Sequence, residues 1–154
     1  MKVAIVTLPP VRIATMRKTG PYGPEIGRFW METFRPWLRE QGLLGEATYG
    51  IGHDDPSVTL AQDCRYDAGV EVGADFRAPA GVFVTLLPGG VHAVAAFSGQ
   101  AWEVPGAWQW LLQAWLPASG QSADFTRPCT EYYPRNWRAE ADGSFACELR
   151  LPLA

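Results

Sequence analysis

The sequence predicts an α+β fold built from two copies of one βαββ unit. Val6-Thr7-Leu8 recurs as Val84-Thr85-Leu86, and Trp37-Leu38 recurs as Trp115-Leu116, so short matches repeat at a nearly constant separation. The same order of expected elements accompanies both sets of matches: strand, strand, helix, strand, strand. Apolar residues make up 47% of the chain and charged residues 19%, which indicates a folded protein with a core and excludes a disordered chain.

Turn-forming residues separate the expected elements of the first half. Pro9-Pro10 ends the first apolar run, and Gly20-Pro21-Tyr22-Gly23 is expected to form a turn. Pro24 suits the first position of a helix, whose apolar residues recur at helical spacing until Gly42 ends it. The expected strands are Val3 to Leu8, Val11 to Thr19, Thr48 to His53 and Cys64 to Val72.

The second half repeats this plan. Pro88-Gly89-Gly90 is expected to form a tight turn, and a helix is expected to begin at Pro105 and to end at Pro117. The expected strands are Gly81 to Leu87, Val91 to Phe97, Cys129 to Tyr133 and Ala146 to Leu151. Because half of this chain is too small to bury a convincing core alone, we expect one domain over residues 1–154, with halves of about 1–78 and 79–154.

Charge and cysteine content exclude several classes of protein. The net charge is −3 and no basic run occurs, so direct nucleic-acid binding is not expected. Cys64, Cys129 and Cys147 have no metal-ligand spacing, and reduced thiols in a cytoplasmic protein are their simplest interpretation. No phosphate-binding loop, zinc motif or membrane span is expected, and no cofactor or metal is predicted.

Several local motifs, taken in order, resemble those of the GyrI-like family, also called the AraC effector-binding domain. Together they extend over almost the whole chain, and their order and spacing make the resemblance specific. The motifs are Val3-x-Ile5, Leu8-Pro9-Pro10, Arg12-Ile13-Ala14, Gly20-Pro21-Tyr22, Asp54-Asp55-Pro56, Cys64-Arg65-Tyr66-Asp67-Ala68-Gly69, Leu87-Pro88-Gly89-Gly90, Glu131-x-Tyr133 and Leu151-Pro152-Leu153.

The resemblance implies a pseudo-twofold antiparallel sheet of about eight strands with two main helices, and a hydrophobic groove between the halves. In drug-sensing regulators of the family this groove takes bulky, often cationic aromatic molecules, with the help of an acidic residue. The Glu-x-Tyr motif assigns that role to Glu131, with Tyr133 beside it. No helix-turn-helix segment is found, so no DNA-binding domain is expected.

Strand alternation adds to this assignment. In a strand from Cys129 to Tyr133, the side chains of Cys129, Glu131 and Tyr133 share one face. Taken alone, a strand glutamate more often faces water. It is the family resemblance that implies that this face of the strand points inward. The other candidate ligand-binding residues are aromatic, namely Tyr49, Tyr66, Trp102 and Trp110, whereas Trp30, Trp37, Trp108 and Trp115 are interpreted as core and Trp137 as either.

Three functions are compatible with these residues. The first is a multidrug-binding, sequestering or sensing module that is not an enzyme and binds hydrophobic, cationic aromatic small molecules. The second is a hydrolase that opens strained cyclopropane-type alkylating compounds, with Glu131 as general acid/base and Tyr133 assisting it. The third is a gyrase-inhibitor-like protein-interaction module, whose partner would be gyrase or a regulator.

Overall fold

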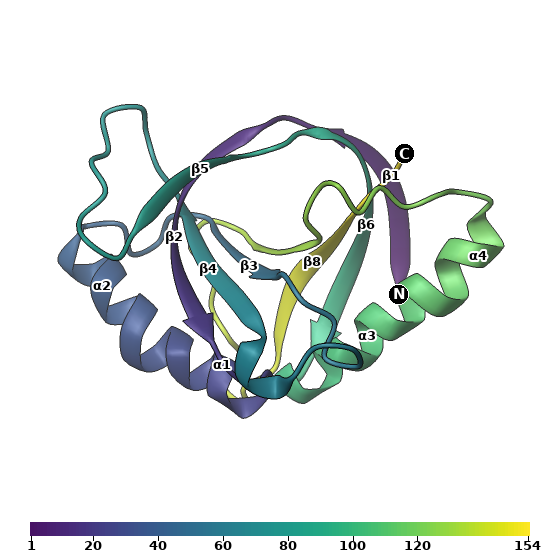
Figure 1. Ribbon diagram of the computed structural model, residues 1–154, viewed down its shortest axis with the longest axis horizontal. Coiled ribbons are helices and arrows are strands. Elements are labelled where there is room, and N and C mark those ends of the chain that lie inside the picture. Colours follow the sequence, from purple (N-terminus) through teal and green to yellow (C-terminus); the bar gives the residue numbers. More distant parts are fainter.

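The computed structural model describes all of residues 1–154. Figure 1 shows a single eight-stranded sheet that curls into an arch, with one helical segment along each side. The strands are β1 (Lys2–Leu8), β2 (Val11–Thr19), β3 (Thr48–Gly52), β4 (Arg65–Glu71), β5 (Phe83–Leu87), β6 (Gly90–Gly99), β7 (Thr130–Tyr133) and β8 (Phe145–Pro152). The helical elements are α1 (Pro24–Phe29), η1 (Trp30–Phe34), α2 (Arg35–Glu40), η2 (Ala61–Asp63), η3 (Ala101–Glu103), α3 (Val104–Trp110), η4 (Leu111–Trp115) and α4 (Leu116–Ser119).

The order of the strands shows the duplication. The sheet runs β1-β6-β8-β7-β3-β4-β2-β5, and every described pair is antiparallel. Exchanging each strand of one half for its counterpart in the other gives the same order from the opposite edge, so a pseudo-twofold axis passes between β3 and β7. The predicted α+β fold with duplicated units, eight strands and two main helices is therefore confirmed.

The two halves also exchange their first strands. β1 pairs with β6 of the second half, and β5 pairs with β2 of the first half. Each half therefore completes the sheet of the other, which local sequence patterns do not predict.

Each helical segment packs on its own part of the sheet. The first segment buries Phe34 and Leu38 against β2 and β4, and the second buries Leu111 against β6 and β8. These two apolar clusters are the main cores, and a smaller cluster with Ile13 and Tyr49 lies on the opposite face of the sheet. Burial of large apolar side chains at roughly 1.5–3 kcal/mol each stabilises both layers.

The end of the second helix differs from the prediction. Pro117 does not end this helix, which continues to Ser119 and is followed by Gly120 in the left-handed region with φ 73°. Pro117 is the second residue after the π-helical turn η4, and Pro36 is likewise the second residue after the π-helical turn η1. A π-helical turn already departs from the regular α-helical bonding, so a proline without an N–H is tolerated just after it. The predicted stop at Gly42 agrees with a helix that ends at Glu40.

None of the helices combines the length and the apolar character that a membrane span requires. All three cysteines are free thiols, and Cys64 and Cys147 are buried.

Candidate functional site

Glu131 lies near the centre of the sheet, on the face that both helical segments cover. In the pairing of β3 with β7, it is directly opposite Gly50. Glu131 is also opposite Leu149 of β8, and Gly50 is opposite Ala68 of β4. Directly opposite residues of antiparallel strands point to the same face, and Leu149 and Ala68 belong to the two helix-packed cores. The Glu131 side chain therefore points into the layer between the two helical segments.

Tyr133 holds the Glu131 carboxyl in place. The Tyr133 hydroxyl donates a hydrogen bond of 2.8 Å to Glu131 Oε2. The Tyr133 ring has three aromatic neighbours, with centroid distances of 5.7 Å to Trp30, 5.2 Å to Trp137 and 6.1 Å to Phe145. These edge-on and tilted contacts fix the phenol from the helix side and from the neighbouring strand.

A second phenol, Tyr66, reaches the same place from β4. Its hydroxyl accepts a hydrogen bond of 2.9 Å from the indole Nε1 of Trp30. It lies over Gly50, where a Cβ atom would collide with it and would stand 3.2 Å from Glu131 Oε2. Glycine at position 50 therefore provides the space that brings this hydroxyl close to the carboxyl.

Burial sets the protonation of these groups. The half-buried Glu131 has a raised pKa because of desolvation, although hydrogen bonding from the Tyr133 and Trp108 side chains acts in the opposite direction. Burial, followed by the negative charge of Glu131, raises the pKa of Tyr66 and of Tyr133 well above the usual tyrosine range. Both phenols are thus protonated hydrogen-bond donors at neutral pH. We call these five residues the Glu131 cluster: Trp30, Tyr66, Trp108, Glu131 and Tyr133.

Among the candidate residues from the sequence, Glu131, Tyr133 and Tyr66 are brought together. Tyr49 does not join them. Its neighbour Gly50 lies on the same face of the sheet as Glu131, so strand alternation places the Tyr49 side chain on the opposite face. There its hydroxyl donates a 2.7 Å hydrogen bond to Glu71. Trp102 and Trp110 have no aromatic partner and remain 78% and 38% exposed.

Trp30 and Trp108 are the members of the Glu131 cluster that sequence reasoning assigned to the core. Both belong to apolar helical stripes, and both do pack against a core. Their indole N–H groups distinguish them from purely apolar core residues, because a buried indole N–H usually requires an acceptor. Trp137, which the sequence left open, packs on Tyr133 and donates a 2.9 Å hydrogen bond to the Ala146 carbonyl.

Two surface depressions lie away from the Glu131 cluster. One of about 310 Å³ is lined mainly by charged residues of β2 and the first helical segment, including Lys18, Glu25 and Arg28. A smaller one, lined by His92 and Arg150 among others, lies beside the turns after β1 and β5. Neither has the apolar walls of a typical small-molecule site. The chemistry of the side chains, rather than the size of a preformed hollow, distinguishes the Glu131 cluster.

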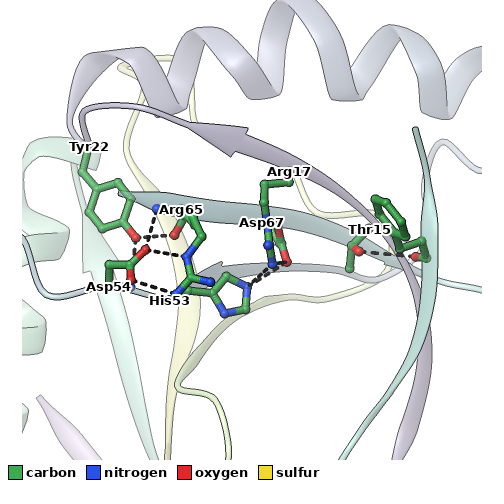
Figure 2. Close-up of polar contacts among 8 residues, drawn as sticks. Thr15, Arg17, Tyr22, His53, Asp54, Arg65 and Asp67 are labelled. Atoms are coloured by element: carbon green, nitrogen blue, oxygen red, sulfur yellow. Dashed lines mark hydrogen bonds and ion pairs between the residues drawn. The ribbon is translucent and has the colours of Figure 1, made fainter. Parts of the chain in front are cut away.

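A second polar cluster lies on the opposite face of the sheet (Figure 2). Asp67 accepts hydrogen bonds of 2.9 and 3.1 Å from Arg17, and one of its oxygens lies 2.7 Å from His53 Nε2. Arg65 and Asp54 form a separate ion pair beside it. These carboxylates are already paired within the chain, so this cluster stabilises the sheet and offers no free anion to a ligand.

Comparison with known proteins supports the assignment made from the motifs. YosT of Bacillus subtilis (strain 168), a protein derived from the SPbeta prophage, is 41% identical over 95 residues, which are 61% of this chain and 64% of YosT. The chain thus matches slightly less than two thirds of that relative's length. A DNA gyrase inhibitor of Cronobacter turicensis is 27% identical over 147 residues, which are 92% of this chain and 85% of the inhibitor.

A solved structure has the same fold at low sequence identity. SAV2435 bound to tetraphenylphosphonium superposes with a TM-score of 0.65 and 15% identity, covering 100% of this chain and 94% of that one. The model of the GyrI-like small molecule binding domain matches residues 1–154. The chain therefore belongs to the GyrI-like family of small molecule binding domains.

Proposed function

We propose that this protein binds hydrophobic, cationic aromatic molecules between its two halves, with Glu131 as the counter-ion. The observation that carries the proposal is a desolvated carboxyl group without a cationic partner. Desolvation raises the pKa of Glu131, and no positively charged side chain contributes to this pKa. An isolated buried carboxylate is costly, and a bound cation would compensate for that cost.

Aromatic side chains around the carboxyl favour a flat or ring-rich cation. Trp30 and Tyr133 are in edge-on contact, and Trp108 approaches Glu131 from the other helical segment. A cation against such rings gains roughly 0.5–2 kcal/mol per contact, the larger values applying where water is excluded. SAV2435, with the same fold, has been solved bound to tetraphenylphosphonium, a cation of this kind.

The polar groups of the cluster would then have separate roles. Tyr133 donates to Oε2 of Glu131 and orients the carboxyl, while Tyr66 presents a second hydroxyl on the other side of Gly50. Because the rings pack against one another in the free protein, a ligand reaches Glu131 by moving at least one of them. The site is therefore expected to form fully only around the ligand.

Titration calorimetry with tetraphenylphosphonium tests this proposal. Glu131→Gln keeps the shape of the side chain and removes its charge, so we expect the dissociation constant to rise more than tenfold, a loss of at least about 1.4 kcal/mol. Glu71→Gln is the matched control, because Glu71 also accepts a tyrosine hydrogen bond but lies on the opposite face. Equal affinity of wild type and Glu131→Gln would dismiss the assignment.

The contact between Tyr133 and Glu131 also supports a second candidate, the cyclopropane-opening hydrolase. A carboxyl group with a raised pKa, hydrogen-bonded to a phenol at 2.8 Å, is suited to general acid/base catalysis. Incubation with a cyclopropane-containing alkylator, followed by mass spectrometry, would show ring-opened product that Glu131→Gln fails to form. A role in protein interaction, suggested by the relative named DNA gyrase inhibitor, predicts retention of gyrase on the immobilised protein.

A further inference from the structure

The helical segment of the second half has an uncharged surface. No charged residue occurs between Glu103 and Asp124, a stretch that contains α3, η4 and α4. The corresponding segment of the first half carries Glu25, Arg28, Glu32, Arg35, Arg39 and Glu40. Since the pseudo-twofold axis relates the two segments, the fold itself does not require either surface to be uncharged.

Two tryptophans are exposed here: Trp110 lies within the uncharged stretch, and Trp102 directly precedes Glu103 at its edge. Trp102 is 78% exposed and Trp110 is 38% exposed, and neither joins the core on which Trp108 and Trp115 pack. Exposed tryptophans are uncommon on monomeric surfaces and are enriched at the energetic centres of protein interfaces. They indicate a surface that another macromolecule covers.

Large and small residues alternate along this surface. Trp102, Gly106, Trp110 and Ala114 follow one another at spacings of about one helical turn, and all four are exposed. A Cβ atom placed on Gly106 would meet nothing within 4 Å, so the space above this position is open. We call these four residues the tryptophan stripe.

The stripe is complementary to a second copy of itself. If two such helices pack antiparallel about a twofold axis level with Trp108, Trp110 of one copy lies opposite Gly106 of the other. Trp102 then lies opposite Ala114, so that each indole meets a small residue. No like charges face each other, because the only charged neighbour, Glu103, lies opposite Gln113.

The exposed indoles supply a large part of the area that such a pair needs. The four indoles of two copies would bury about 500 Å², given roughly 150–250 Å² for a full aromatic side chain. In the pair, the exposed uncharged side chains beside them, including Pro105 and Gln109, would supply the rest of the roughly 1,200 Å² of a specific interface. A membrane surface is the poorer match, because interfacial helices usually carry lysine or arginine on their polar side.

We propose that the protein forms a twofold dimer through the tryptophan stripe. This proposal is independent of the ligand, since Glu131 lies on the sheet beneath the helices. It assigns Trp102 and Trp110 to a protein contact and leaves the Glu131 cluster free in each copy.

Sedimentation velocity over a range of protein concentrations tests the dimer. Wild type is expected to sediment as a dimer at high micromolar concentration, and Trp110→Glu is expected to raise the dissociation constant at least about tenfold. Met31→Glu is the matched control: Met31 is 64% exposed on the charged helical segment, and its substitution should leave the dimer unchanged.

Gly106→Leu separates association from folding. The site has room for a side chain in the isolated chain, and leucine favours a helix more than glycine does, so the melting temperature of the monomer should rise. In the proposed dimer the same side chain fills the space that receives Trp110, so the dimer should weaken at least about tenfold. The proposal is overturned if wild type stays monomeric, if the dimer survives both Trp110→Glu and Gly106→Leu, or if the stripe associates only with lipid vesicles.

Discussion

Substitution of Gly50 by alanine tests the packing of the Glu131 cluster. Position 50 lies on β3 directly opposite Glu131, and its missing side chain leaves the space that the Tyr66 hydroxyl occupies. A methyl group there requires Tyr66 to move, because the Cβ would also stand 3.1 Å from Tyr66 Cζ. Any such movement stretches the 2.9 Å hydrogen bond from Trp30.

The expected cost follows from three contributions. Overpacking of a buried site costs about 1–3 kcal/mol, and the weakened hydrogen bond from Trp30 costs about 1 kcal/mol more. Replacing glycine by alanine within a strand offsets this loss of stability by roughly 0.5–1 kcal/mol, because alanine loses less backbone entropy on folding. We therefore expect Gly50→Ala to lower the free energy of unfolding by about 2 kcal/mol and to weaken binding of tetraphenylphosphonium.

Urea unfolding at neutral pH measures this change. Gly52→Ala, on the same strand, is the matched control, since a Cβ there would only make ordinary contacts with Tyr22 and should cost little. In a Tyr66→Phe background the hydroxyl is absent, so the cost of Gly50→Ala should fall by about half in a double-mutant cycle. Wild-type stability of Gly50→Ala, or an equal cost in both backgrounds, would refute this account of the packing.

Two further predictions concern protonation. Because burial raises the pKa of Glu131, the affinity for a cationic ligand should increase as the pH rises through that pKa, whereas affinity of Glu131→Gln should stay flat; a flat wild-type profile from calorimetry would contradict this. On the opposite face, burial alone would raise the pKa of Asp67, but hydrogen bonds and charge from His53 and Arg17 outweigh it, so the pKa is lowered. The stability from this group is therefore present at neutral pH and is lost as the pH falls below the usual aspartate range. Asp67→Asn should cost about 1–2 kcal/mol in urea unfolding at pH 7, a value reduced by the partial exposure of Arg17, and much less in acid. If Asp67→Asn lost the same stability at pH 7 and in acid, the packing of the side chain and not its charge would be the cause, which would contradict this account.

Most of the fold could be predicted because it depends on local patterns. The apolar runs, the prolines and the repeat of Val6-Thr7-Leu8 as Val84-Thr85-Leu86 each place an element within a few residues of its observed position. The exchange of β1 and β5 between the halves could not be predicted, since it depends on long-range pairing. The continuation of the second helix past Pro117 depends on the π-helical turn before it, which has no simple sequence pattern.

The candidate site was predicted only where one strand determines it. Alternation within β7 correctly places Glu131 and Tyr133 on one face, and the structure shows that helices cover this face. Alternation does not give the register between strands. The sequence therefore could not show that Gly50, and not Tyr49, lies on the same face as Glu131. Helical periodicity likewise gave Trp30 a core position but could not show that the core side of this helix borders the carboxyl.

The most direct test of the central claim is the difference in affinity between a cation and its neutral analogue. Methyltriphenylphosphonium and the uncharged triphenylphosphine oxide each carry three phenyl rings on phosphorus, so their affinities differ mainly through charge. We predict that wild type prefers the cation by at least about tenfold, and that Glu131→Gln loses this preference while its affinity for the neutral compound is little changed. An equal preference for the cation in wild type and Glu131→Gln would contradict the role of Glu131 as counter-ion.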